Sequence, residues 1–430
     1  MKRIVSLILS AIIIIILASS CNNNHSNSNS EVFTPTLDNE YKCSIKIVGD
    51  YSNFEALEAE FDKFNEYYPN VELSYIKLDD YKNNLSITLN GNEKPNIFFS
   101  YTWMIGDEKY KSVVSLMENF SNSTLKSNLD CIRRGLINHD ENGNVLMVPV
   151  FSRTYGMLVN NDLFNKEKID VPSTWDELID ACNKLKENGH KSPMMGYSLT
   201  SSSSLMNTIA YPLFVSELAK NEEALNLANS LDSRAGVYMK GALEKVDSLI
   251  KNGCIDLDSC DEIKDNYEKV LLRFFEGDVP MMICTGDTVS GTKKREEKSE
   301  AFTKSPFNYS FSPIPLTNEG GYFIDSPSIE FSVNKDCDNL DMTNEFMKFL
   351  ISNKELNEMA KIKRLTTPTR EMSFDSVYAP FAKISSDRIF YPEALGIKDQ
   401  LTAQTRNASF KVGRGELTVS EAVSKYGSFA

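Results

Sequence analysis

Apolar and polar positions in the first part of the chain alternate between two periods. Residues 43–48 and 71–76 show the two-residue period of strands, and apolar residues over 54–64 recur at helical spacing. A helical stretch over 79–90 and a short apolar strand at 96–99 follow. The order strand, helix, strand, helix, strand predicts a parallel α/β layer.

Two short motifs predict where helices begin. Residues 52–55, Ser-Asn-Phe-Glu, and residues 174–177, Thr-Trp-Asp-Glu, both fit a capping box, in which a hydroxyl and an acid three residues later bond each other's backbone amides. Leu178, Ala181 and Leu185 then share one face of the second helix.

The remaining chain continues the same mixture of short strands and helices. We expect strands at 145–150, 156–160, 279–284, 309–311, 322–324 and 328–333, helices within 210–263 and at 266–275, 341–351 and 355–361, a charged, solvated connection at 292–305, and helices with loops to the end.

The first 21 residues have the pattern of a secretory signal. Lys2 and Arg3 precede an apolar run, which is too short to span a bilayer, and small residues lead into Cys21. The approach to Cys21 resembles the bacterial lipobox, although Ala18 stands where Leu is commonest. We therefore predict a signal peptide at 1–20, a palmitate-type lipid on Cys21 and a flexible Asn/Ser tether at 21–40; an ordinary cleaved signal is the alternative.

Net charge and chain length limit the classes of function that the protein can have. Without residues 1–20 the chain carries 44 basic and 60 acidic residues, a net charge of −16, which disfavours a nucleic-acid partner. About 390 residues after the tether favour two lobes. The three histidines, His25, His139 and His190, leave little material for imidazole catalysis or a histidine-rich metal site.

The cysteines and glycines suggest no cofactor or metal site. Once Cys21 is assigned to lipid, seven scattered cysteines remain without a C-x-x-C pair, and a local bridge between Cys254 and Cys260 stays open. Gly286–Lys293 does not fit a phosphate loop, because Thr292 separates the second glycine from the lysine. We therefore predict no cofactor and no metal.

Several blocks, in their order, resemble the extracellular solute-binding proteins of bacterial ABC importers, in the branch of maltose-binding protein and sugar-binding lipoproteins. The most specific is VPSTWDEL at 171–178. The others are FDKFNEYYPNVELSY (61–75), PNIFF (95–99, with Asn96 replacing the usual Asp), VLMVPVFSRTYGMLVNNDLF (145–164), FFEGDVPMMICTG (274–286) and GRGELTVSEA (413–422).

The resemblance implies an α/β fold of two lobes, the type II periplasmic-binding-protein fold, with ligand held in the cleft between them. The chain would cross between lobes near Pro149, Cys284 and Pro327. The N-terminal lobe would then comprise 41–149 plus 285–327, and the C-terminal lobe 150–284 plus 328–430. Closure of the lobes would trap the solute.

Strand ends and crossings supply the candidate ligand-binding residues, since aromatic faces pack against sugar C–H patches and polar groups bind hydroxyls. They are Asp50, Tyr51, Tyr101, Trp103, Arg153, Tyr155, Ser201, Asp287, Tyr322 and Asp325.

Some of these candidates have an alternative role. Trp103 could be a core aromatic, Arg153 could form a salt bridge between lobes, and Ser201 could belong to a flexible loop. Asp287 stands where many members of the family carry a tryptophan. Trp175 is expected to have a structural packing role, and we do not include it among the ligand-binding candidates.

The sequence thus predicts a non-enzymatic receptor, anchored by lipid on the outer (extracellular or periplasmic) face of the cell membrane. Its partners would be a mono- or oligosaccharide and the permease of an ABC importer. A surface glycan hydrolase and a sensory or adhesion lipoprotein are the alternatives. Polyamines are another possible ligand, since Asp50, Asp287 and Asp325 could bind them.

Overall fold

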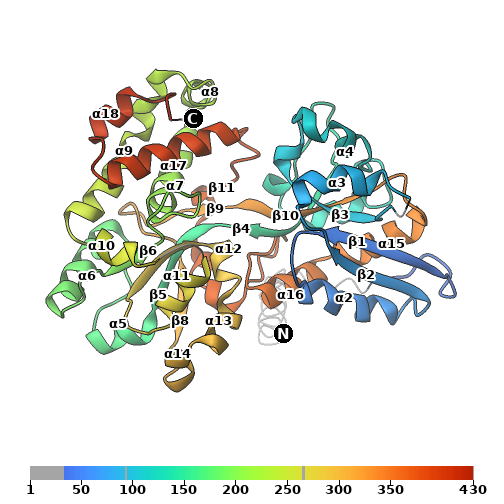
Figure 1. Ribbon diagram of the computed structural model, residues 1–430, viewed down its shortest axis with the longest axis horizontal. Helices are drawn as coiled ribbons and strands as arrows, with labels where there is room; N and C mark the ends of the chain where they lie inside the picture. Colours follow the sequence, from blue (N-terminus) through green and yellow to red (C-terminus); the bar gives the residue numbers. More distant parts are fainter. Residues whose placement is uncertain (1–32, 93, 264–266, 430) are drawn as a thin grey trace, which may run out of the picture. The chain divides into compact units, whose positions relative to one another are not determined.

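The computed structural model describes residues 33–92, 94–263 and 267–429 (Figure 1). The fold described here is that of the compact unit that begins at Pro35. The predicted signal peptide, Cys21 and the beginning of the tether lie outside the described residues. Within the described ranges, no helix combines the length and apolar character needed to cross a membrane.

Five strands form the first sheet, in the order β2 (Val71–Lys77), β1 (Cys43–Gly49), β3 (Ile97–Ser100), β10 (Ser326–Val333) and β4 (Val148–Arg153). β1 pairs in parallel with β2 and β3, while β10 is antiparallel to β3 and β4. The parallel layer predicted at the N-terminal end is confirmed.

Helices α2 (Glu55–Asn65), α3 (Tyr81–Leu89), α15 (Leu340–Leu350) and α16 (Asn353–Lys363) belong with this sheet, and together we call them the first lobe. Phe64 of α2 packs against Phe346 and Phe349 of α15, with ring centroids 5.1 and 5.5 Å apart. The capping box predicted at 52–55 is wrong, since Phe54 is the N-cap of α2 and makes no side-chain cap bond.

Four strands form the second sheet, in the order β6 (Met194–Gly196), β7 (Met281–Thr285), β5 (Tyr155–Asn160) and β8 (Tyr309–Ser312). Around it lie α6 (Trp175–Glu187), α7 (Leu205–Leu218), α9 (Gly236–Lys251) and α17 (Asp399–Gly413); we call this group the second lobe. α7 is buried on nearly every face because α9 and α17 both pack against it. The capping box at Thr174 is confirmed.

Shorter elements complete the fold. The pair β9 (Phe323–Ile324) and β11 (Ile389–Phe390) forms a separate small sheet. The short helices are α4 (Lys111–Ser115), α5 (Asn161–Glu167), α8 (Glu222–Asn229), α10 (Leu257–Asp261), α11 (Tyr267–Phe274), α12 (Gly286–Val289), α13 (Thr292–Lys298), α14 (Glu300–Lys304) and α18 (Val419–Ser424). Residues 292–305 contain α13 and α14, and most of them are exposed, as predicted, although Arg295 of α13 is buried.

The chain passes between the lobes at three places. β4 leads through Thr154 into β5, Asp325 joins β9 to β10, and residues 366–370 leave α16 for the second lobe. In Figure 1, β4 and β10 run side by side between the two groups of elements. Pro149 lies in β4 and Pro327 in β10.

The predicted crossing near Cys284 is wrong. Cys284 lies inside β7, and the chain then stays in the second lobe as far as β8, which pairs with β5. The expected ranges 285–327 and 328–430 therefore do not coincide with the two sheets, because β8 lies in the second and β10 in the first. A local apolar pattern predicts that a segment forms a strand, but it does not predict which sheet the strand joins.

Candidate functional site

A cavity of about 890 Å³ lies between the lobes, within the size range of small-molecule sites. Both lobes and two of the crossings line it. The first lobe contributes Lys82, Thr102, Trp103, Ile105, Gly106, Asp107, Asn138 and His139; the crossings contribute Arg153, Thr154 and Ser326; the second lobe contributes Tyr155, Ser202, Ser203, Tyr211, Thr285, Asp287, Pro392, Glu393, Ile397, Lys398, Asp399, Thr402, Ala403 and Arg406.

Trp103 is the aromatic surface on the first-lobe side. It lies in the short helical turn Thr102–Met104 that follows β3, where the chain leaves the sheet. Its ring stacks on Tyr101 at 5.4 Å and 11°, and the Tyr101 hydroxyl donates to Asp50 Oδ2 at 3.1 Å. Lys82 Nζ lies 5.0 Å from the centre of the indole. Tyr101 and Asp50 do not line the cavity themselves but hold Trp103 in place.

Tyr51 lies behind this group. Its ring meets Phe54 and Phe99 edge-on at 5.4 and 5.6 Å, and its carbonyl accepts from Tyr75. Gly49, two residues earlier, faces Phe99 so closely that a Cβ would come within 2.5 Å of the ring. Tyr51 is thus part of the packing beneath Asp50 and is not among the cavity-lining residues.

Two tyrosines form the aromatic surface on the second-lobe side. Tyr155 begins β5 and packs against Tyr211 of α7 at 5.2 Å between ring centroids. Burial raises the pKa of Tyr155 to about 12, although the nearby charge of Arg153 lowers it, so the phenol is neutral at physiological pH. The cavity therefore has aromatic rings from both lobes.

An ion pair lies in the cavity wall. Arg153, the last residue of β4, donates through Nη1 to Asp287 Oδ2 at 3.2 Å, and Ser328 Oγ of β10 donates to Asp287 Oδ1 at 2.9 Å. Both charged side chains remain about half exposed. The wall thus presents a guanidinium and a carboxylate side by side. A ligand hydroxyl can accept a hydrogen bond from the guanidinium and donate one to the carboxylate.

Two polar atoms in the wall have no hydrogen-bond partner among the described residues: Thr154 Oγ1 and Glu393 Oε2. Burial raises the pKa of Glu393 from 4.5 to about 7, outweighing its own backbone amide, Arg153 and Ser326, which favour the charged form. Buried polar groups are normally paired, so these two atoms are sites where a ligand or water would gain a bond.

The other three predicted residues lie outside the cavity lining. Ser201 itself is absent from the lining, although its neighbours Ser202 and Ser203 belong to it. Tyr322 packs on Phe390 at 5.7 Å. Asp325 is fully buried, and its Oδ2 accepts from Arg133.

The wall formed by Glu393 and by Thr402, Ala403 and Arg406 of α17 was not predicted. The sequence indicates a helix in this region, but which face meets the cavity depends on how α17 packs on α7. No motif at Glu393 could have pointed to the site.

One acidic group in the first lobe has the spacing of metal ligands: Glu60, Glu355 and Glu358. Lys63 Nζ lies among them, 2.9 Å from Glu60 Oε1 and 2.9 Å from Glu355 Oε2. The lysine supplies the balancing positive charge, so the group is an ion-pair cluster on α2 and α16.

Comparison with known proteins finds matches in both sequence and fold. A family model described as bacterial extracellular solute-binding protein matches residues 49–356. The melibiose/raffinose/stachyose-binding protein MelE of Bacillus subtilis (strain 168) is 22% identical over 199 residues. That alignment covers 45% of this chain and 44% of MelE, less than half of either protein.

Solved structures share the fold at low identity. Apo RafE from Streptococcus pneumoniae superposes with a TM-score of 0.69 at 16% identity, covering 90% of this chain and 97% of RafE. The sugar transporter BL01359 from Bacillus licheniformis, solved with stachyose, gives a TM-score of 0.61 at 16% identity, covering 90% and 100%. The predicted two-lobed, type II periplasmic-binding-protein fold is confirmed. Because the family model spans well over half of its length, the chain belongs to the bacterial extracellular solute-binding protein family.

Proposed function

We propose that the protein captures an oligosaccharide in the cavity between its lobes and delivers it unchanged to the permease of an ABC importer. The observation that carries this proposal is the composition of the cavity wall. Aromatic rings from both lobes, Trp103 on one side and Tyr155 with Tyr211 on the other, are interspersed with hydroxyl, amide and charged groups. Sugars need this combination, because their rings have apolar C–H faces and polar edges.

The charge balance of the wall favours a neutral solute over a polyamine. Its four basic side chains, Lys82, Arg153, Lys398 and Arg406, match four acidic ones, Asp107, Asp287, Glu393 and Asp399. Asp287 is already paired with Arg153, and Asp325 with Arg133. A polyamine would instead need several unpaired carboxylates. The names of two similar proteins, which mention melibiose, raffinose and stachyose, support the same choice.

The two bodies that close on the sugar would be 35–152 with 326–369, and 155–324 with 372–429. This assignment follows the strand pairing and the places where the chain crosses. The sugar would bias the lobes toward closure by contacts made only in the closed form. A lipid on Cys21 would hold the receptor at the outer face of the membrane, near the permease.

We propose a receptor rather than a hydrolase, since the matched family and the similar structures are binding proteins. A thermal-shift series with melibiose, raffinose and stachyose tests the binding. A sugar at 100 times its dissociation constant stabilises the folded state by about 2.7 kcal/mol. Chromatography of the same mixtures after prolonged incubation tests for cleavage. Failure of every saccharide to stabilise the protein would refute the carbohydrate proposal, and cleaved product would favour the hydrolase.

A further inference from the structure

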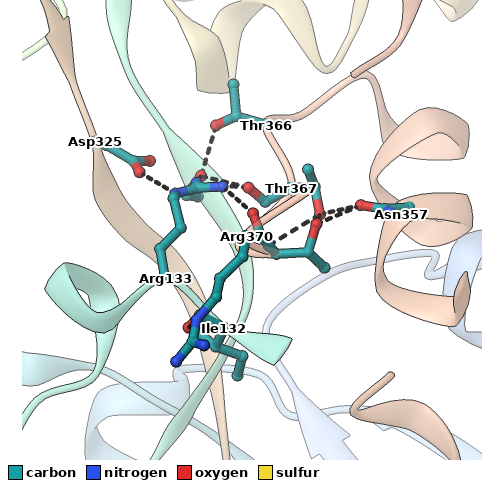
Figure 2. Close-up of polar contacts among 9 residues, drawn as sticks. Ile132, Arg133, Asp325, Asn357, Thr366, Thr367 and Arg370 are labelled. Carbon is teal, nitrogen blue, oxygen red and sulfur yellow. Dashed lines mark hydrogen bonds and ion pairs between the residues drawn. The ribbon is translucent and has the colours of Figure 1, made fainter. Parts of the chain in front are cut away.

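One buried side chain of the first lobe reaches all three crossings (Figure 2). Arg133, only 6% exposed, donates through Nε to Asp325 Oδ2 at 2.7 Å. Its Nη2 donates to the Thr367 carbonyl at 2.6 Å and to Ser152 Oγ at 3.1 Å, and its Nη1 donates to the Thr369 carbonyl at 2.5 Å. Ser152 lies in the first crossing, Asp325 in the second and the two threonines in the third.

Further bonds hold the third crossing to the first lobe. The hydroxyls of Thr367 and Thr369 both donate to Asn357 Oδ1 of α16 at 2.7 Å. Arg370 donates through Nε to the Ile132 carbonyl at 3.1 Å, as Figure 2 shows. Beyond this anchored stretch, Met372 has a φ of +51°, an unusual conformation for a residue other than glycine. The bend into the second lobe therefore follows directly after the anchored stretch.

Two of the residues that Arg133 binds lie next to residues of the cavity lining. Ser152 precedes Arg153, and Asp325 precedes Ser326, and both of these neighbours line the cavity. The backbone amide of Asp325 also donates to the Phe390 carbonyl at 2.8 Å, at the start of the second-lobe segment that carries Glu393. A shift of the guanidinium would thus be transmitted to cavity residues on two crossings.

We propose that Arg133 is a positioning residue, which fixes the angle between the lobes by tying the three crossings together and thereby holds Arg153 and Ser326 toward the ligand. Arginine is suited to this because its planar fork bonds several fixed acceptors at once. Lysine keeps the charge for Asp325 but offers one compact ammonium, which cannot reproduce bonds from three separate nitrogens. This proposal does not depend on the solute being a sugar.

The test compares Arg133→Lys with Arg295→Lys. Arg295 is equally buried, 5% exposed, and pairs with Glu268 of the second lobe. Both variants should lower the unfolding midpoint. Small-angle X-ray scattering of the ligand-free protein should show an altered radius of gyration in R133K alone. If stachyose binds the wild type, R133K should bind it about tenfold more weakly by calorimetry, with R295K unchanged.

Equal scattering profiles for R133K and R295K would overturn the proposal. Should R133K fail to fold, Ser152→Ala provides the second measurement, since it removes one acceptor of Arg133 at small cost in volume. S152A should shift the scattering in the same direction, and a profile identical to that of the wild type would count against the proposal. If no saccharide binds the wild type, the carbohydrate proposal fails, while the ligand-free scattering still decides the role of Arg133.

Discussion

Arg153 and Asp287 form a 3.2 Å ion pair that joins the end of β4 to the first turn of α12. They lie 134 positions apart in the chain, Arg153 as the last residue of β4 and Asp287 two residues after the end of β7. Because both side chains are about half exposed in the cavity wall, the pair is open to a ligand. It joins the first crossing directly to the second lobe.

Asp287→Asn should weaken ligand binding far more than folding. Exposed ion pairs contribute about 0–1 kcal/mol to stability, so the unfolding midpoint should barely move. The loss of a charged acceptor at the ligand should weaken binding about tenfold, since hydrogen bonds to charged groups are worth about 1.5–3 kcal/mol. Calorimetric titration with the saccharide that binds the wild type measures this effect. Glu217→Gln, which removes the exposed Lys220–Glu217 pair, is the matched control and should change neither quantity. Wild-type affinity in D287N would contradict the prediction.

The two tryptophans give an internally controlled test. Trp103 lines the cavity, whereas Trp175 lies outside the lining, with Lys245 Nζ 3.5 Å from its ring centre. Trp103→Phe should abolish most of the fluorescence change on sugar addition and reduce affinity. Trp175→Phe should keep both at the wild-type level. A fluorescence change that survives in W103F and disappears in W175F would show that Trp103 does not stack on the ligand.

The sequence predicted well those features that depend on local pattern. The strand and helix order of the first lobe and the capped helix α6 were predicted. Four of the predicted ligand-binding residues, Trp103, Arg153, Tyr155 and Asp287, line the cavity because each lies near a strand end or a crossing, and their contact with a ligand stays a prediction. Open α/β sheets bring strand ends to one edge, so this rule works without knowledge of the tertiary fold.

Features that depend on distant partners were not predictable. Asp325 was expected at the ligand, yet it is bound by Arg133, 192 positions earlier, and no local motif marks that pairing. The crossing at 366–370 was not predicted. A crossing was expected near Cys284 instead, because a buried strand followed by glycine looks alike inside a lobe and between lobes. Glu393 belongs to the cavity only because its segment is held near the second crossing.

Four cysteines should resist alkylation in the native protein. Cys182, Cys254, Cys260 and Cys284 are buried free thiols, and burial raises the pKa of Cys260 to about 12. Cys254 and Cys260 are both free, so the local bridge that the sequence left open is not formed in the structure. Peptide mapping after iodoacetamide treatment at pH 8 should find these four labelled only when urea is present, because burial keeps the reagent from their sulfur atoms in the folded protein. Native labelling at any of them, or a Cys254–Cys260 disulfide in the digest, would contradict this prediction.

Glu393 should make stability depend on pH near neutrality. Because burial raises the pKa of its carboxyl group in the folded protein from 4.5 to about 7, the folded state binds more protons between these values. Its stabilising contribution is complete below about pH 4.5 and is lost as the pH rises through 7, by at most about 3 kcal/mol. In Glu393→Gln this loss should vanish, because glutamine stays neutral throughout.

Urea unfolding of both proteins from pH 5 to 8 measures the effect as a difference. Glu60, with a pKa raised by burial to about 8, and the buried Glu330 change stability in the same direction, but they are present in both proteins and cancel. Glu300→Gln, at an almost fully exposed position of α14, should reproduce the wild-type profile. A saturating sugar that donates hydroxyl hydrogens to the ionised carboxylate would lower its pKa and flatten the wild-type profile toward that of E393Q. Identical wild-type and E393Q profiles without sugar would show that the carboxyl group is ionised throughout this pH range, like an ordinary surface glutamate.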